Sequence, residues 1–124
     1  GFGQASDMIN FAKDAQYTAI VDDWGPYYIE RIQEVLDGTW ESKSTWAGLS
    51  EGHVVMAPYT NLPDDVVEMA EATEAKIKGG WEPFTGPITK QDGTVAAEEG
   101  VTLDDGAILG MDWYVQGVDD KLPQ

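Results

Sequence analysis

The chain has 124 residues, and its 23 acidic side chains against 7 lysines and arginines give a formal net charge of -16. This length suits one modest domain, and the charge disfavours nucleic acid and anionic lipid as partners because like charges repel. The absence of cysteine excludes disulfides, thiolate metal sites and a cysteine nucleophile.

The first third of the chain is predicted to form a short helix, a strand and a second helix. Ser6 is a good N-cap, and the apolar spacing after it predicts a helix over 8–12. The β-branched and aromatic run at 17–21 predicts a buried strand. A helix is predicted over 26–37, because this segment starts with proline, carries an apolar stripe and is followed by Gly38.

The middle of the chain repeats the strand-and-helix pattern after a polar segment rich in turn residues. An apolar run predicts a second strand over 54–57. Pro63 begins a predicted helix over 64–78, which has two aspartates in its first turn and lysines in its last turn. The order β, α, β, α with short strand-to-helix junctions predicts an α/β domain with a parallel sheet flanked by helices.

The segment from Phe84 onward is predicted to be the least regular part of the chain. A turn at Asp92 and Gly93 indicates a hairpin. A short helix capped by Thr102 follows, and residues 111–118 are interpreted as a closing strand or a helical turn. The expected fold class is therefore α/β with an irregular C-terminal segment.

Acidic and aromatic side chains follow the predicted strands, at the points where ligands bind in open α/β sheets. Carboxylates accept hydrogen bonds from O–H and N–H groups, and an indole face stacks on a flat ring. These loops carry no lysine or arginine, so they favour a neutral or cationic ligand with hydrogen-bond donors over a phosphate. The candidate ligand-binding residues are Ser6, Asp7, Asp22, Asp23 and Trp24, and a third loop with Tyr59, Thr60 and Asn61 is expected at the same edge of the sheet.

Each candidate also has a purely structural interpretation. Asp7 and Asp23 stand where aspartate commonly caps a helix, and Trp24 has a side chain that packs readily. His53 has no serine, cysteine or second histidine at a catalytic spacing, and it is interpreted as a structural or surface residue. The patterned calcium-binding loop is missing, so no metal site and no cofactor are predicted.

Several fragments, in their order and spacing, resemble one known family. They are "GQASDM", "TAIVDDWGPYY", "VVMAPY", "PFTGPITKQDG" and "MDWYVQGVDDKLP". Together they resemble the C-terminal part of the basic membrane protein (BMP, or PnrA-like) family, the substrate-binding proteins of ABC importers. The resemblance implies a type I periplasmic-binding-protein fold, in which two α/β lobes joined by hinge strands close on a ligand. Residues 1–124 would then be mostly the second lobe, with hinge-proximal segments toward the end, and the N-terminal lobe would be missing.

The resemblance also implies a function and a location. A nucleoside, nucleobase or related heterocycle would be bound between two lobes without catalysis and passed to an ABC transporter permease. The protein would be periplasmic, or an extracytoplasmic lipoprotein anchored to a bacterial membrane. Nucleoside-binding members carry the motif G-x-D-x-D-Q at the loop that spans residues 3–8 here, and this chain keeps the second acid of the motif as Asp7. Those members also carry a lysine at the position that is Asp22 in this chain. We therefore expect Trp24 to replace lost polar contacts by stacking on a flat ring.

Two other functions are compatible with the same residues. Asp22 or Asp23 paired with Asp7 would suit an acid–base enzyme, and a nucleoside-hydrolase-like enzyme would bind the same ligands. A ligand-free interaction module with an acidic surface is the other alternative. If the chain is a partial lobe, it is expected to expose an apolar face, because its helices bury stripes against a sheet that is only partly present.

Overall fold

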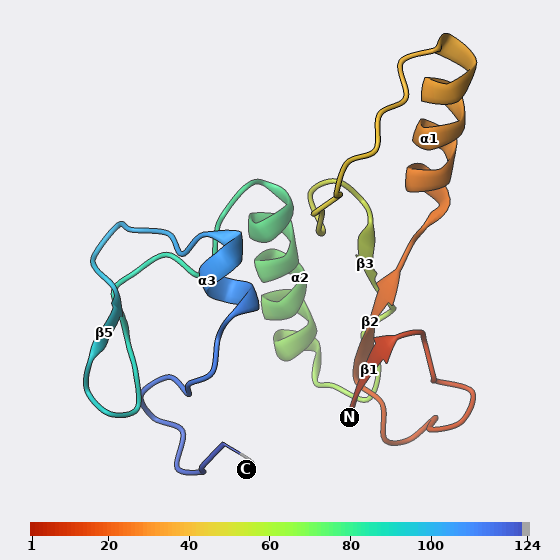
Figure 1. The fold of residues 1–124 in the computed structure, drawn as a ribbon. Helices are drawn as coiled ribbons and strands as arrows, with labels where there is room; N and C mark the ends of the chain where they lie inside the picture. Colours follow the sequence, from red (N-terminus) through yellow and green to blue (C-terminus); the bar gives the residue numbers. More distant parts are fainter. Residues whose placement is uncertain (123–124) are drawn as a thin grey trace. The chain divides into compact units, whose positions relative to one another are not determined.

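The computed structural model describes residues 1–122, which form two compact units. The first unit spans Gly1–Trp81 and the second begins at Glu82. The first unit contains β1 (Phe2–Ala5), β2 (Thr18–Asp22), α1 (Gly25–Asp37), β3 (Val54–Met56) and α2 (Asp64–Lys78) (Figure 1). The second contains β4 (Ile88–Thr89), β5 (Val95–Ala97) and α3 (Asp105–Leu109). The α/β class predicted from the sequence is confirmed.

The sheet of the first unit has the order β1-β2-β3 and is mixed in direction. Strand β1 runs parallel to β2, with Phe2 opposite Thr18. Strand β3 runs antiparallel to β2, with Ile20 opposite Met56 and Asp22 opposite Val54. The prediction of an all-parallel sheet was therefore wrong for the pair formed by β2 and β3.

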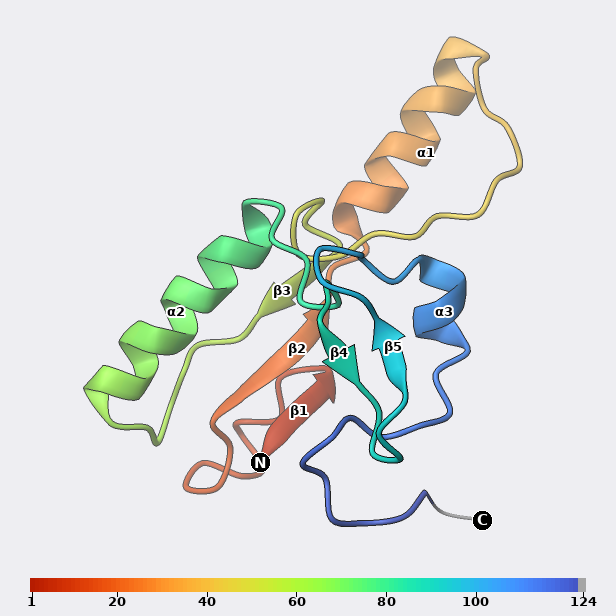
Figure 2. The same ribbon diagram turned by 90° about the vertical axis from the view of Figure 1, so that its left-hand side faces the viewer.

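The reason for the reversed direction is the long connection over 38–53 between α1 and β3. An ordinary connection from a helix to the next parallel strand takes about 2–6 residues. Here the longer segment carries the chain back from the far end of α1 to the end of β2 (Figure 2). The Asp23 amide donates to the His53 carbonyl at 2.8 Å, which starts β3 beside the end of β2.

Small residues and Gln16 form the buried part of this unit. Ala19 and Ala57 are its buried apolar residues, and Thr18 is 2% exposed. The Thr18 hydroxyl donates to the Ala57 carbonyl at 2.7 Å, which joins β2 to the segment after β3. This hydrogen bond satisfies two buried polar groups at the centre of the unit.

Replacing Thr18 with valine keeps the shape of the side chain and removes its hydroxyl. We expect the free energy of unfolding to fall by about 1.5 kcal/mol, because the buried Ala57 carbonyl loses its partner. Chemical denaturation of the two proteins measures the difference. The matched control is Thr73→Val, which removes an exposed bond to the Met69 carbonyl and should change stability by less than about 0.5 kcal/mol. Equal effects at both positions would contradict the role given to Thr18.

The two long helices form where the sequence predicted them. Helix α1 starts at Gly25, one residue before Pro26, and ends at Asp37, with Gly38 as its C-cap at a φ of 70°. Helix α2 spans Asp64–Lys78, with acids in its first turn and lysines in its last turn. Helix α1 has no buried residue, and its apolar stripe is open to solvent, which confirms the expected exposed face; the stripe consists of Tyr28, Ile29, Ile32, Val35 and Leu36.

The helix predicted over 8–12 does not form, and this segment consists of turns. Ala5 has a φ of 63°, which reverses the chain directly after β1. The side chains of Asp7 and Gln16 then accept hydrogen bonds from the amides of Ile9 and Met8, respectively. These local bonds occupy amide groups in a turn and compete with helix formation.

The second unit contains the predicted hairpin. Strands β4 and β5 pair antiparallel, and the Asp92 carboxylate accepts from the amide and hydroxyl of Thr94 in the turn between them. The N-cap of α3 is Asp104, whose side chain accepts from the Ala107 amide, so Thr102 was the wrong residue. Residues 111–118 form neither a strand nor a helix, and they contribute one bridge through Val115.

Candidate ligand-binding site

A pocket of about 160 Å³ opens where β2 passes into α1. It is lined by Asp22, Trp24, Thr45, Ala47, His53 and Val54. One wall is the junction between β2 and α1, and the other is formed by the return segment 38–53 with the start of β3. A second hollow of about 410 Å³ shares Thr45, Ala47 and His53 with this pocket.

Asp22 supplies an acceptor that has no internal partner. It is the last residue of β2 and is exposed. Within residues 1–122, no hydrogen bond or ion pair engages its carboxylate. A carboxylate in this state can accept hydrogen bonds from N–H or O–H groups of a ligand.

Trp24 supplies a flat apolar face beside Asp22. Its side chain is 56% exposed, and it occupies the N-cap position of α1 without making a side-chain capping bond. The Tyr27 ring meets the indole edge to face at 5.7 Å, and the Tyr28 ring lies tilted at 6.3 Å. These two tyrosines support the indole and leave much of its surface free for stacking.

Asp23 is engaged by the backbone just before α1, although the N-cap position itself is Trp24. Its Oδ1 accepts from the Gly25 amide at 2.9 Å, at the entrance of α1. It does not line the pocket that contains Asp22 and Trp24. The structure therefore distinguishes two neighbouring aspartates, one occupied by the backbone and one unoccupied.

Ser6 and Asp7 lie outside this pocket. The Asp7 carboxylate accepts from the Ile9 amide at 3.0 Å and from Gln16 Nε2 at 2.7 Å. Gln16 is buried and precedes β2, so these bonds draw Asp7 back toward the amino end of that strand. Ser6 is exposed on the turn that leads there.

The third predicted loop lies at the opposite edge of the sheet. Because β3 is antiparallel to β2, its carboxyl end lies beside the start of β2. The Thr60 amide accordingly donates to the Tyr17 carbonyl at 2.7 Å. The expectation that Tyr59, Thr60 and Asn61 share an edge with Asp22 was wrong for this reason.

His53 is the pocket residue that sequence reasoning interpreted as structural. Antiparallel pairing places it next to Asp23, and its ring meets Tyr27 edge to face at 6.2 Å. Its side chain lines the same pocket as Asp22 and Trp24. The only signal in the sequence was its position directly before a strand, which does not reveal the direction of that strand.

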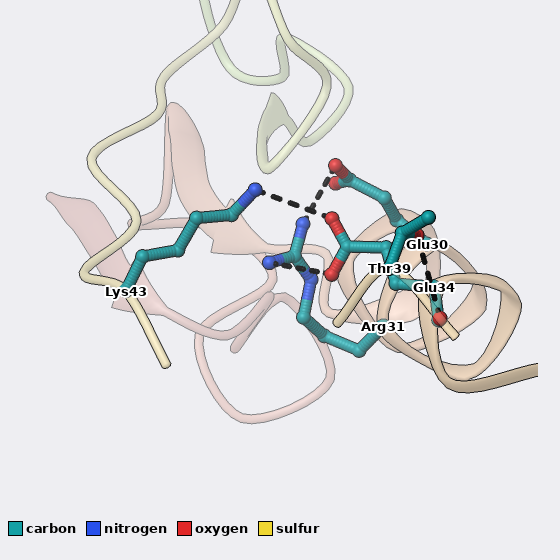
Figure 3. A network of polar contacts seen from close by, with 5 residues as sticks. All are labelled: Glu30, Arg31, Glu34, Thr39 and Lys43. Atoms are coloured by element: carbon teal, nitrogen blue, oxygen red, sulfur yellow. Dashed lines mark hydrogen bonds and ion pairs between the residues drawn. The ribbon is translucent and has the colours of Figure 1, made fainter. Parts of the chain in front are cut away.

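A network of ion pairs fastens the return segment to α1 (Figure 3). Arg31 Nη1 lies 3.0 Å from Glu34, and Arg31 Nη2 lies 2.6 Å from Glu30. Lys43 on the return segment reaches Glu34 at 3.2 Å. The Arg31 guanidinium also lies over the Tyr27 ring, 5.4 Å from its centroid. This network links the return segment, which forms one wall of the pocket, to α1, whose start forms the other wall.

The described residues offer neither a metal site nor a helix that could span a bilayer. Within 1–122, no three His, Cys, Asp or Glu side chains gather in a way that could hold a metal ion. None of the helices in that range is long and apolar enough to cross a membrane.

Comparison with known proteins finds no family model that matches the chain. A protein of Brucella abortus (strain 2308) named purine-binding protein is 63% identical over 124 residues, covering 99% of this chain. The chain spans 35% of that relative's length. The crystal structure of a transcriptional activator of the comK gene from Bacillus halodurans superposes with a TM-score of 0.55, over 66% of this chain and 30% of that one. At 20% identity, this second likeness supports the α/β fold alone.

Proposed function

We propose that the protein binds a purine, as a nucleobase or nucleoside, at the pocket of Asp22 and Trp24. The observation that carries the proposal is the juxtaposition of an unoccupied carboxylate and an exposed indole in one pocket. A purine offers a flat ring for the indole and N–H groups for the carboxylate. The purine-binding name of the 63%-identical relative supports the same ligand class.

We further propose that the protein is the solute-binding component of an ABC importer, located outside the cytoplasmic membrane. In this proposal a second lobe closes over the ligand, and the closed form docks on the permease. The protein is either periplasmic or held at the outer face of the membrane by a lipid anchor. The α1 helix exposes an apolar stripe that a further part of a longer polypeptide would cover. The 35% coverage of the relative is consistent with such a further part.

Binding without catalysis is the function favoured over hydrolysis. An acid–base enzyme acting on a glycosidic bond needs two carboxylates directed at the ligand. Here the Asp7 and Asp23 carboxylates are engaged with Gln16 and with the Gly25 amide. Asp22 remains as a single acceptor, which suits recognition.

Calorimetry on the whole protein tests the proposal, with adenine, hypoxanthine, adenosine and inosine as ligands and cytosine as the control. We expect at least one purine to bind in a saturable manner and cytosine to bind much more weakly, because the smaller ring stacks less area on the indole. Chromatography of the nucleoside samples should show no release of free base. Absence of binding to all four purines would refute the proposed ligand class, and release of base would establish the hydrolase.

Replacing Asp22 with asparagine tests the assigned acceptor. We expect purine affinity to fall about fivefold, or about 1 kcal/mol, because a charge-assisted hydrogen bond becomes a neutral one. The matched control is Asp23→Asn, which keeps an oxygen for the Gly25 amide and should leave affinity within about twofold. A larger loss from Asp23→Asn than from Asp22→Asn would reverse the assignment of the two aspartates.

A further inference from the structure

We infer that His53 is a second polar contact for the ligand, one that selects purines carrying a hydrogen-bond acceptor next to a donor. This inference rests on the proposed function, because it concerns the same pocket. His53 lines that pocket together with Asp22 and Trp24. Nothing in its sequence neighbourhood distinguishes it, and its role follows from the antiparallel start of β3.

The backbone of His53 is fixed at the site. Its carbonyl accepts from the Asp23 amide at 2.8 Å. Asp23 directly follows Asp22, which supplies the free carboxylate. Since Val54 lies opposite Asp22 in the sheet, His53 enters the pocket at the same end of β2. Its position therefore follows from the strand pairing and does not depend on a mobile loop.

The imidazole ring is held through Tyr27. Tyr27 meets His53 edge to face at 6.2 Å and meets Trp24 edge to face at 5.7 Å, so it neighbours both rings. The Arg31 guanidinium lies 5.4 Å from the Tyr27 centroid and is fixed by Glu34. This support sets the indole and the imidazole in a defined relation before any ligand arrives.

The ring nitrogens of His53 have no hydrogen-bond partner among residues 1–122. A neutral imidazole offers one N–H donor and one acceptor, whereas the Asp22 carboxylate only accepts. Together the two side chains complement a ligand edge that presents an N–H next to a ring nitrogen or a carbonyl oxygen. The 6-amino group and N7 of adenine form such an edge, and so do N1–H and O6 of hypoxanthine.

The experiment compares His53→Phe with His53→Gln in the whole protein, by calorimetry with adenine and hypoxanthine. Phenylalanine keeps the ring that packs on Tyr27 and removes the polar atoms, whereas glutamine keeps a donor and loses the ring. We expect His53→Phe to weaken binding of the preferred purine about fivefold or more, and His53→Gln to stay within about threefold of the wild type. 6-Methylpurine has the shape of adenine but lacks the amino donor, and it should bind the wild type more weakly than adenine does.

The possible outcomes separate this inference from the proposed function. Wild-type protein that binds neither adenine nor hypoxanthine would overturn both. Purine binding that His53→Phe leaves unchanged, or that only His53→Gln impairs, would overturn the inference alone and return His53 to a packing role. Equal affinity of the wild type for 6-methylpurine and adenine would also overturn the proposed edge recognition.

Discussion

Replacing Gly86 with alanine is expected to cause the largest loss of stability, about 3 kcal/mol in the second unit. A Cβ atom on Gly86 would lie 2.0 Å from the Glu98 carbonyl oxygen and 2.6 Å from that of Ala97. The backbone has little freedom to move away, because the Gly86 amide donates to Val101 and its carbonyl accepts from Gly100. The clash is with backbone atoms, so no side-chain rotation relieves it.

Hydrogen exchange of the whole protein measures this effect at the amides of Gly86, Gly100 and Val101. All three should exchange faster in the variant, while amides of β2 should be unaffected. The matched control is Gly48→Ala, where the nearest atom to a new Cβ is a side-chain oxygen at 4.0 Å. Protection in the Gly86 variant that equals the wild type would show that this part of the backbone tolerates a side chain.

Replacing Trp24 with alanine is expected to have the largest effect on ligand binding. If the indole stacks on a purine, affinity should fall about 30-fold, or about 2 kcal/mol, the value typical of base–aromatic stacking. Calorimetry with the purine that the wild type prefers measures the change. The fold should survive, because the side chain is 56% exposed and contributes little to the buried part of the unit.

A second exposed tryptophan provides the control for this substitution. Trp40 is 52% exposed and follows α1 at its other end, away from the pocket of Asp22. Trp40→Ala removes the same surface and should leave purine affinity unchanged. Equal losses from the two substitutions, or no loss from either, would remove Trp24 from the binding site.

The parts of the fold that depend on local signals could be predicted from the sequence. Helix α2 has the bounds that its acidic first turn and basic last turn indicated, and α1 differs by one residue. The turn at Asp92 and Gly93 also formed the expected hairpin. In each case the residues that decide the structure lie within a few positions of one another.

The parts that depend on distant contacts could not be predicted. The direction of β3 is set by the course of the whole segment 38–53, which carries no local signal for a reversal. The failed helix after Ser6 depends on Gln16, whose side chain bonds to the Met8 amide and to Asp7. Helix propensity and apolar spacing do not predict a hydrogen bond between side chains and amides that lie eight or nine residues apart.

In the candidate site, too, the residues that are close in sequence could be predicted and those brought together by distant contacts could not. Asp22 and Trp24 come together because they are two residues apart at one strand-to-helix junction, so the sequence was sufficient to pair them. Asp7 was expected beside them, but its carboxylate is bound by Gln16 within its own loop. His53 joins the pocket through strand pairing, and no pattern in the sequence indicates this.

The antiparallel return of the chain also affects how ligand preference can change in evolution. One side of the pocket belongs to the strand-to-helix scaffold, whereas Thr45 and Ala47 on the other side belong to an irregular segment outside the sheet. Irregular segments accept substitutions, insertions and deletions more readily than the elements they connect. Under the proposed function, related chains can therefore diverge in ligand by altering residues 38–53, while Trp24 and Asp22 stay constant.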